Sequence, residues 1–388
     1  MSGTRRMKIG LAGPFPVFPS DSPSGVPEVV RLLARSLSSL DEIELHVVTT
    51  SRLAQKELML TEGMLSLHVL PSSRTRRIAT FLLDDILAIR GKLTELDVDL
   101  VHSQGLPEFI WAGVLSGKAH LCTVHGIWRA EVIYADTLKA QVHQRLRTLM
   151  ERMYSGRIHD LVVISPYVIQ ALPTLSKSRQ YRISNPVDDR YFSVTGHGVP
   201  GRVLFVGKIC KLKGIDTLLR AFAQARVNVP HAELHVVGPS DLDGEYLARI
   251  TELAASLRVE DSVKFTGPLT GDRLYTEYEE AGVFCLPSYQ ETAPMAIAQA
   301  MAANRPVVGT NVGGIPSMVT DRETGLLCPA GDHNLLSRLL TTILTDTPLA
   351  DRLATAARNV ADREYRSESV ARKTMLVYSK LLGKSSTE

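Results

Sequence analysis

The sequence predicts an α/β protein built from two doubly wound domains. Its 388 residues exceed the roughly 100–200 that are usual for one domain. The chain opens with a strand at residues 7–12, a loop, a helix at 28–40 and a second strand at 43–49. The same order starts again with a strand at 202–206 and a helix at 215–225. Two such openings predict two parallel sheets, each covered by helices.

Polar and turn-forming residues mark the expected boundaries. Asn185-Pro186 and the Gly-rich stretch 193–201 interrupt the periodic pattern and are typical of a linker. We therefore expect a first domain at residues 1–184 and a second at 185–365. An amphipathic tail follows at 366–388.

Composition indicates a globular protein of the cytoplasm. Apolar residues make up 44% of the chain and charged residues 22%, both ordinary values. The four cysteines form no C-x-x-C pair, so we expect buried reduced thiols and no zinc site. The basic N-terminus is followed by prolines and does not resemble a signal peptide. No uncharged apolar run reaches the ~20 residues that a membrane span needs.

Positive charge gathers in the first domain. Residues 1–184 hold 22 Lys and Arg against 17 Asp and Glu, a net of +5, whereas residues 185–388 have a net of −2. Two expected basic amphipathic helices, at 72–93 and 138–154, favour peripheral contact with an anionic membrane. Ordinary scatter of surface charge is the alternative. The basic residues of these two helices are Arg74, Arg76, Arg77, Lys139, Arg145, Arg147 and Arg152. We expect no nucleic-acid partner.

One stretch of the second domain carries the strongest functional signal. A short apolar strand at 283–286 leads into a loop, and Thr292 is expected to cap a helix at 295–303, with Pro294 in its first turn. Asn304 suits a left-handed helix end. Glu291 stands where the strand meets the helix. Ligands of such sheets bind beyond the carboxyl ends of strands, so this junction predicts a binding site.

The order of residues here resembles the signature of the retaining glycosyltransferases of family 4. The matching parts are Pro287-Ser288, Glu291, the Ala-rich helix, Pro306-Val307-Val308 and Gly313-Gly314. The resemblance implies a GT-B fold, in which two Rossmann-like domains face each other across a cleft and the C-terminal helix packs back on the first domain. It also implies transfer of a sugar from a nucleotide diphosphate sugar to an acceptor hydroxyl, with retained anomeric configuration.

The resemblance assigns the donor phosphates to three places. Ser24-Gly25 lies where relatives hold a small-Gly pair against the diphosphate, although a flexible loop is the alternative. Lys208 and Lys213 flank the turn after the strand at 202–206, where relatives have Arg and Lys. Two cations and free helix N–H groups suit a pyrophosphate. The helix N-terminus adds a donor-binding contribution from Thr292, Ala293 and Met295.

Catalytic roles follow from the same resemblance. Glu291 is expected to hold the sugar hydroxyls, and His125, at the end of a strand, to contact the sugar. Gln299 stands where relatives use a second Glu to bind the ribose, so nucleotide binding should be weaker here. No metal or other cofactor is expected, because Asp97-Val98-Asp99 is better explained as a turn than as a metal motif.

Two alternatives to a transferase remain open. A non-catalytic binding subunit that partners an active transferase would explain the departures at Lys208, Gln299 and residues 292–294. A sugar nucleotide epimerase would need further carboxylates that the sequence does not identify. The sequence leaves the nucleobase, the sugar and the acceptor open. The basic first domain favours a lipid-linked saccharide or glycolipid acceptor, as in surface polysaccharide assembly.

Overall fold

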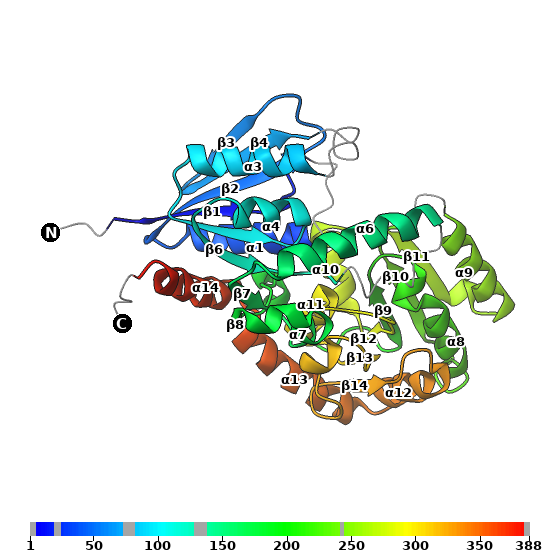
Figure 1. Ribbon diagram of the computed structural model, residues 1–388. Coiled ribbons are helices and arrows are strands. Elements are labelled where there is room, and N and C mark those ends of the chain that lie inside the picture. Colours follow the sequence, from blue (N-terminus) through cyan, green and yellow to red (C-terminus); the bar gives the residue numbers. More distant parts are fainter. Residues whose placement is uncertain (1–4, 19–24, 73–81, 128–137, 241–243, 384–388) are drawn as a thin grey trace. The chain divides into compact units, whose positions relative to one another are not determined.

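The computed structural model describes residues 5–18, 25–72, 82–127, 138–240 and 244–383 (Figure 1). The chain divides into two compact units. Unit 1 comprises residues 1–186 and 367–388, and unit 2 comprises residues 187–366. The C-terminal helix is therefore part of unit 1, whereas the boundary between the units at residue 186 lies in the Asn-Pro segment.

Unit 1 holds an eight-stranded sheet in the order β3-β4-β2-β1-β5-β6-β7-β8. All neighbours pair in parallel except β3 and β4. Later strands are added on one side of β1 and then on the other side of β5, so the strand order reverses between these two neighbours. The strands are β1 (Met7–Ala12), β2 (Ile43–Ser51), β3 (Leu58–Glu62), β4 (Leu65–Pro71), β5 (Leu100–Gln104), β6 (Ala119–Thr123), β7 (Asp160–Val163) and β8 (Arg179–Arg182).

The helices of unit 1 bury apolar faces against this sheet. Val30, Leu33 and Leu37 of α1 lie in one hydrophobic cluster with Val370 and Val377 of α14, so burial of a shared apolar face holds the C-terminal helix in unit 1. The helices are α1 (Val26–Ser38), α3 (Leu83–Glu95), α4 (Pro107–Val114), α6 (Leu138–Ser155), α7 (Tyr167–Ala171) and α14 (Ser367–Leu381), with a 3₁₀ turn η2 (Pro173–Lys177).

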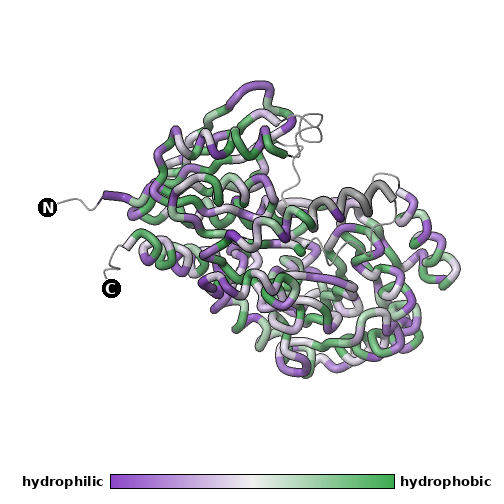
Figure 2. The backbone as a smooth tube through the Cα atoms, in the orientation of Figure 1, coloured by the Kyte–Doolittle hydropathy of each residue, from purple (hydrophilic) through white to green (hydrophobic). Residues whose placement is uncertain are grey.

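Unit 2 holds a six-stranded parallel sheet in the order β11-β10-β9-β12-β13-β14. Its central strands are mostly apolar and buried, as expected where helices cover a parallel sheet. Figure 2 shows the hydrophobic stretches of the backbone in green. The strands are β9 (Arg202–Val206), β10 (Glu233–Val237), β11 (Val263–Gly267), β12 (Val283–Leu286), β13 (Val307–Thr310) and β14 (Leu326–Cys328). The helices are α8 (Ile215–Ala225), α9 (Glu245–Ser256), α10 (Gly271–Glu280), α11 (Met295–Ala302), α12 (His333–Thr345) and α13 (Thr347–Glu364), with 3₁₀ turns η3 (Asp189–Ser193), η4 (Lys211–Lys213), η5 (Glu260–Ser262) and η6 (Ile315–Ser317).

The predicted starts of two helices are wrong. The cap of α11 is Pro294 and not Thr292, and no side chain caps this helix. Pro294 has an extended backbone (ψ 116°), so it precedes the helix instead of lying in its first turn. The described part of the helix expected at 72–93 begins only at Leu83, after a left-handed Leu82, and Arg74, Arg76 and Arg77 lie outside the described residues. Asn304 is left-handed (φ 55°), as predicted.

The aspartates of the expected turn are both engaged. Asp97 has a left-handed backbone (φ 46°) and pairs with Lys118, with 2.7 Å between Oδ1 and Nζ. Asp99 Oδ2 accepts the backbone N–H of Lys8 at 2.9 Å. These contacts fix the turn before β5 and agree with its interpretation as a turn. All four cysteines lie in the described residues and none forms a disulfide; Cys122, Cys285 and Cys328 are buried as predicted, whereas Cys210 is half-buried.

Candidate functional site

The candidate site of unit 2 lies beyond the carboxyl ends of β9 and β12. These strands are neighbours, and the strand order runs outward from them in opposite directions. A crevice forms at such a switch point because the two connections leave to opposite faces of the sheet. The loop after β9 carries Lys208 and Lys213, and the loop after β12 carries Glu291.

Glu291 is a buried carboxylate with two partners. Its side-chain oxygen Oε1 accepts hydrogen bonds from Lys213 Nζ at 2.5 Å and from Ser288 Oγ at 2.7 Å. Only 8% of the residue is exposed. Lys213 and Ser288 supply the opposite charge and the hydrogen bond that a buried carboxylate needs. The second oxygen, Oε2, has no hydrogen-bond partner in the part of the chain that the structure describes.

Two glycines allow the backbone around Glu291 to pack closely. Gly313 has a left-handed backbone (φ 53°), and a Cβ atom there would lie 1.9 Å from the carbonyl oxygen of Glu291. That same oxygen accepts the N–H of Gly314 at 3.0 Å. Glycine is therefore required at position 313 for this close approach, whereas Gly314 contributes its backbone N–H from an ordinary helical conformation.

The loop that carries Lys213 is joined to the loop after β12. Gly214 is left-handed (φ 67°), and a Cβ atom there would lie 2.2 Å from the carbonyl oxygen of Pro287. The N–H of Tyr289 donates to Leu212 O at 2.8 Å. Lys213 is thus positioned by backbone contacts, whereas Lys208, also after β9, is exposed.

The start of α11 and Gln299 complete the predicted donor residues of unit 2. Thr292 is buried, and Ala293 and Met295 are half-buried. Gln299 Oε1 accepts a hydrogen bond from the hydroxyl of Tyr278 at 2.9 Å. The sequence analysis missed Tyr278, which is fully buried and stacks on Phe284 with 5.8 Å between ring centroids. This hydroxyl therefore uses the oxygen that was expected to bind the ribose.

In unit 1, His125 follows β6 and is half-buried. Its Nε2 lies 2.6 Å from Oε1 of Gln104, the last residue of the neighbouring strand β5. Burial lowers the pKa of His125 to about 4, so the ring is neutral at pH 7. Gly25 is the exposed cap residue of α1 with φ 65°, and Ser24 lies outside the described residues.

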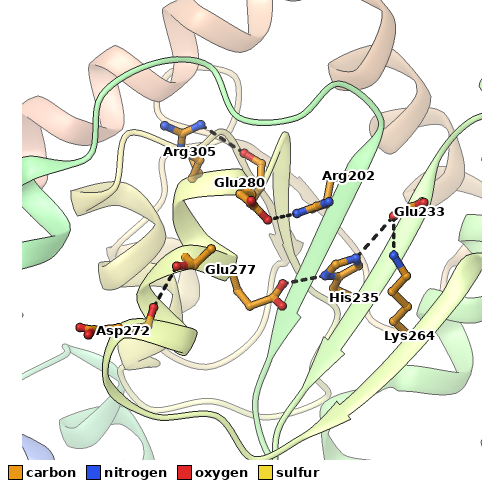
Figure 3. Close-up of polar contacts among 10 residues, drawn as sticks. Arg202, Glu233, His235, Lys264, Asp272, Glu277, Glu280 and Arg305 are labelled. Carbon is orange, nitrogen blue, oxygen red and sulfur yellow. Dashed lines mark hydrogen bonds and ion pairs between the residues drawn. The ribbon is translucent and has the colours of Figure 1, made fainter.

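A second polar cluster of unit 2 lies at the opposite, amino end of the strands (Figure 3). Arg202 and Glu233 are the first residues of β9 and β10, and Arg202 forms an ion pair with Glu280 of α10. His235 Nδ1 lies 2.7 Å from Glu277 Oε2 (Figure 3). These contacts join α10 to the sheet. None of these residues belongs to the loops that carry Lys213 and Glu291.

Comparison with known proteins follows the same division of the chain. The model of the family described as "Glycosyltransferase Family 4" matches residues 23–191, and that described as "Glycosyl transferases group 1" matches residues 191–360. The chain belongs to glycosyltransferase family 4. Its fold class, GT-B with two Rossmann-like domains, is thereby confirmed.

Relatives and solved structures agree with this assignment. A protein of Salinispora arenicola named D-inositol 3-phosphate glycosyltransferase is 40% identical over 172 residues, which are 42% of this chain and 38% of that protein. The sucrose-phosphate synthase of Thermosynechococcus elongatus has a TM-score of 0.78 at 24% identity, covering 97% of this chain and all of that one. Anabaena HepE in complex with UDP has a TM-score of 0.70 at 15% identity, covering 96% and 100%.

These comparisons support different conclusions. At 24% identity or less, the solved structures show the fold alone. The matched stretches span between 34% and 52% of the length of the curated relatives. Within the described residues, no group of three His, Cys, Asp or Glu side chains is placed to hold a metal ion. No helix in the described ranges has the length and apolarity that crossing a membrane requires.

Proposed function

We propose that this chain transfers a sugar from a nucleotide diphosphate sugar to an acceptor hydroxyl, with retained anomeric configuration and without a metal ion. The observation that carries the proposal is the buried Lys213–Glu291 pair at the switch point of unit 2. In this assignment the Lys213 ammonium binds the donor diphosphate, and the open oxygen of Glu291 accepts hydrogen bonds from sugar hydroxyls. The N–H groups at the start of α11 add a dipole that favours the phosphates.

The proposed chemistry needs compensation for the charge of the leaving diphosphate. Lys213 and Lys208 supply two positive charges without a metal. Glu291 fixes the sugar so that the acceptor hydroxyl attacks the anomeric carbon from the face that the diphosphate leaves, and a phosphate oxygen takes the hydroxyl proton. Ser288 and Gly313 hold Glu291 for this task, since one bonds its side chain and the other admits its backbone. His125 of unit 1 is assigned to a sugar hydroxyl.

A donor panel tests the proposal. Thermal shifts are measured with UDP, GDP, ADP and their glucose conjugates on the wild type, on Lys213→Ala and on Lys211→Ala, a control for an exposed lysine of the same 3₁₀ turn. A nucleotide at a hundred times its dissociation constant should stabilise the protein by about 2.7 kcal/mol. The wild type and Lys211→Ala should respond to one nucleotide, and Lys213→Ala should not. A Lys213→Ala variant that responds like the wild type would remove the diphosphate role.

Product analysis separates the transferase from a binding subunit. With the selected donor, a transferase releases free sugar slowly in the absence of an acceptor, and EDTA leaves the rate unchanged. NMR of the product should show the anomeric configuration of the donor. Binding without any hydrolysis or transfer would favour the non-catalytic alternative.

We further propose a lipid-linked saccharide or a glycolipid as the acceptor. Because relatives are named D-inositol 3-phosphate glycosyltransferase, we include inositol 3-phosphate among the acceptors to be tested. Support for a membrane surface comes from α6, where Leu149 and Met153 are exposed one turn apart and Arg145 is exposed on the same helix. Sedimentation with phosphatidylglycerol vesicles should exceed that with phosphatidylcholine vesicles, and Leu149→Gln should lower it. Equal sedimentation with both lipids would count against membrane contact.

A further inference from the structure

A chain of hydrogen bonds in unit 1 connects the C-terminal helix to His125. The hydroxyl of Tyr378, on α14, lies 2.7 Å from Nδ1 of His102. Nε2 of His102 lies 3.0 Å from Nε2 of Gln104, and Oε1 of Gln104 lies 2.6 Å from Nε2 of His125. The residues come from α14, β5 and the end of β6, and Tyr378 is 276 positions from His102 in sequence.

With the amide of Gln104 oriented as in the structure, the chain has a consistent direction of donors and acceptors. The side-chain nitrogen of Gln104 is a donor, so the Nε2 atom of His102 that it contacts is unprotonated. Burial lowers the pKa of His102 to about 3, so the ring is neutral and its proton is on Nδ1, which donates to the Tyr378 oxygen. Thr123 Oγ1, 2.8 Å from Nε2 of His102, donates to the same unprotonated atom.

The other end of Gln104 determines the state of His125. Its amide oxygen can only accept, so Nε2 of His125 carries the proton. A neutral imidazole has one donor and one acceptor nitrogen, and the acceptor of His125 is then Nδ1. A hydroxyl that contacts Nδ1 of this ring must therefore donate a hydrogen bond to it.

Packing holds the side chain of Gln104 between the two imidazole rings. His102 and Gln104 are each 1% exposed, and Tyr378 is fully buried. Gln104 ends β5, beside β1, where the strand order of unit 1 changes direction. A Cβ atom on Gly13, after β1, would lie 2.7 Å from Cβ of Gln104. The left-handed Gly105 (φ 73°) would similarly contact the His125 ring at 3.2 Å if it had a Cβ atom.

We propose that Gln104, His102 and Tyr378 are positioning residues, which hold His125 as the Nε2–H tautomer so that Nδ1 accepts a hydrogen bond from a hydroxyl of the donor sugar. The sugar contact rests on the proposed function, whereas the tautomer does not. The C-terminal helix thereby contributes to the site through Tyr378. The chain differs from a catalytic triad in that no member changes its protonation state.

Imidazole ¹⁵N NMR without ligand tests the tautomer. The protein has 11 histidines, and loss of a signal in His125→Gln assigns the ring. In the wild type, Nε2 of His125 should have the shift of a protonated nitrogen and Nδ1 that of an unprotonated one. Gln104→Met removes the acceptor and should give averaged shifts, whereas Gln104→Glu keeps an oxygen against Nε2 and should keep the tautomer. Ser103→Ala is a control: it removes the hydrogen bond between Ser103 Oγ and His120 Nε2, beside Gln104 in the chain, and should leave the His125 shifts unchanged.

Kinetics test the consequence for the sugar. Gln104→Met should lower kcat by about tenfold or more while the dissociation constant of the nucleoside diphosphate stays within about twofold, since misplacing one group acts on the sugar step. Gln104→Glu should recover most of the rate. Wild-type His125 with the proton on Nδ1, or an unchanged tautomer in Gln104→Met, would overturn the proposal. If the wild type turned over no nucleotide sugar, the proposed function would fail and the spectra would still decide the tautomer.

Discussion

Replacing Glu291 by Gln should separate binding from turnover. The substitution keeps the size of the side chain and the contact with Ser288 but removes the charge that Lys213 faces at 2.5 Å. In the proposed site, Glu291 would compete with the donor phosphates for Lys213, and it would also repel them. Glu291→Gln should therefore bind a nucleoside diphosphate more tightly than the wild type while transferring sugar much more slowly.

The magnitudes follow from the burial of the pair. The side chains of Lys213 and Glu291 are 21% and 9% exposed, so solvent screens their attraction only partly. Losing one charge-assisted hydrogen bond should lower the free energy of unfolding by about 1–3 kcal/mol. Release of about 1 kcal/mol of competition for Lys213 should tighten nucleotide binding about fivefold. Under the proposed function, loss of the carboxylate assigned to the sugar should lower kcat at least about a hundredfold.

Calorimetric titration with the nucleotide selected by the donor panel measures the affinity, and urea unfolding measures the stability. Glu277→Gln is the matched control, because Glu277 is also a shielded carboxylate of unit 2, 15% exposed and paired with His235 at the amino end of the strands (Figure 3). It should lower stability and leave nucleotide affinity and kcat unchanged. Weaker nucleotide binding in Glu291→Gln, or a kcat near that of the wild type, would refute the reasoning.

Three further predictions concern other contacts. Gln299→Glu should lower the nucleotide dissociation constant measured by calorimetry. Tyr278 occupies one side-chain oxygen, and the second oxygen of Glu would offer the ribose a charged acceptor in place of the amide N–H₂. Unchanged or weaker binding would exclude a ribose contact. Gly313→Ala should lower the free energy of unfolding, followed in urea, by more than Gly271→Ala, since both are left-handed but only Gly313 meets backbone, and equal losses would contradict a required close approach. The free energy of unfolding in urea should fall as pH drops from 6.5 toward 4. A buried neutral histidine such as His102 contributes up to about 1.4 kcal/mol per pH unit, because the unfolded chain takes up the proton at a higher pH than the folded one. A flat profile, or an equal slope in His102→Gln, would contradict this.

Local sequence patterns predicted several elements closely. The helix expected at 215–225 has those bounds, because a glycine precedes it and its apolar spacing is regular. Asn304 ends α11 in the left-handed conformation because Arg305-Pro306 prevents further helix. The cap of α11 was mispredicted, because propensity ranks Thr above Pro at a cap, whereas the packed loop after β12 places Pro294 there.

The sequence by itself determined what depends on neighbouring residues: two doubly wound α/β domains, the family motif around Glu291, and the glycine at 313 that its backbone requires. Tertiary structure decided which side chains meet. Lys213 reaches Glu291 across 78 positions because β9 and β12 are neighbours in the sheet. Tyr378 reaches His102 because α14 packs against α1 in unit 1. Strand order and helix docking depend on burial summed over a whole unit, which no local pattern records.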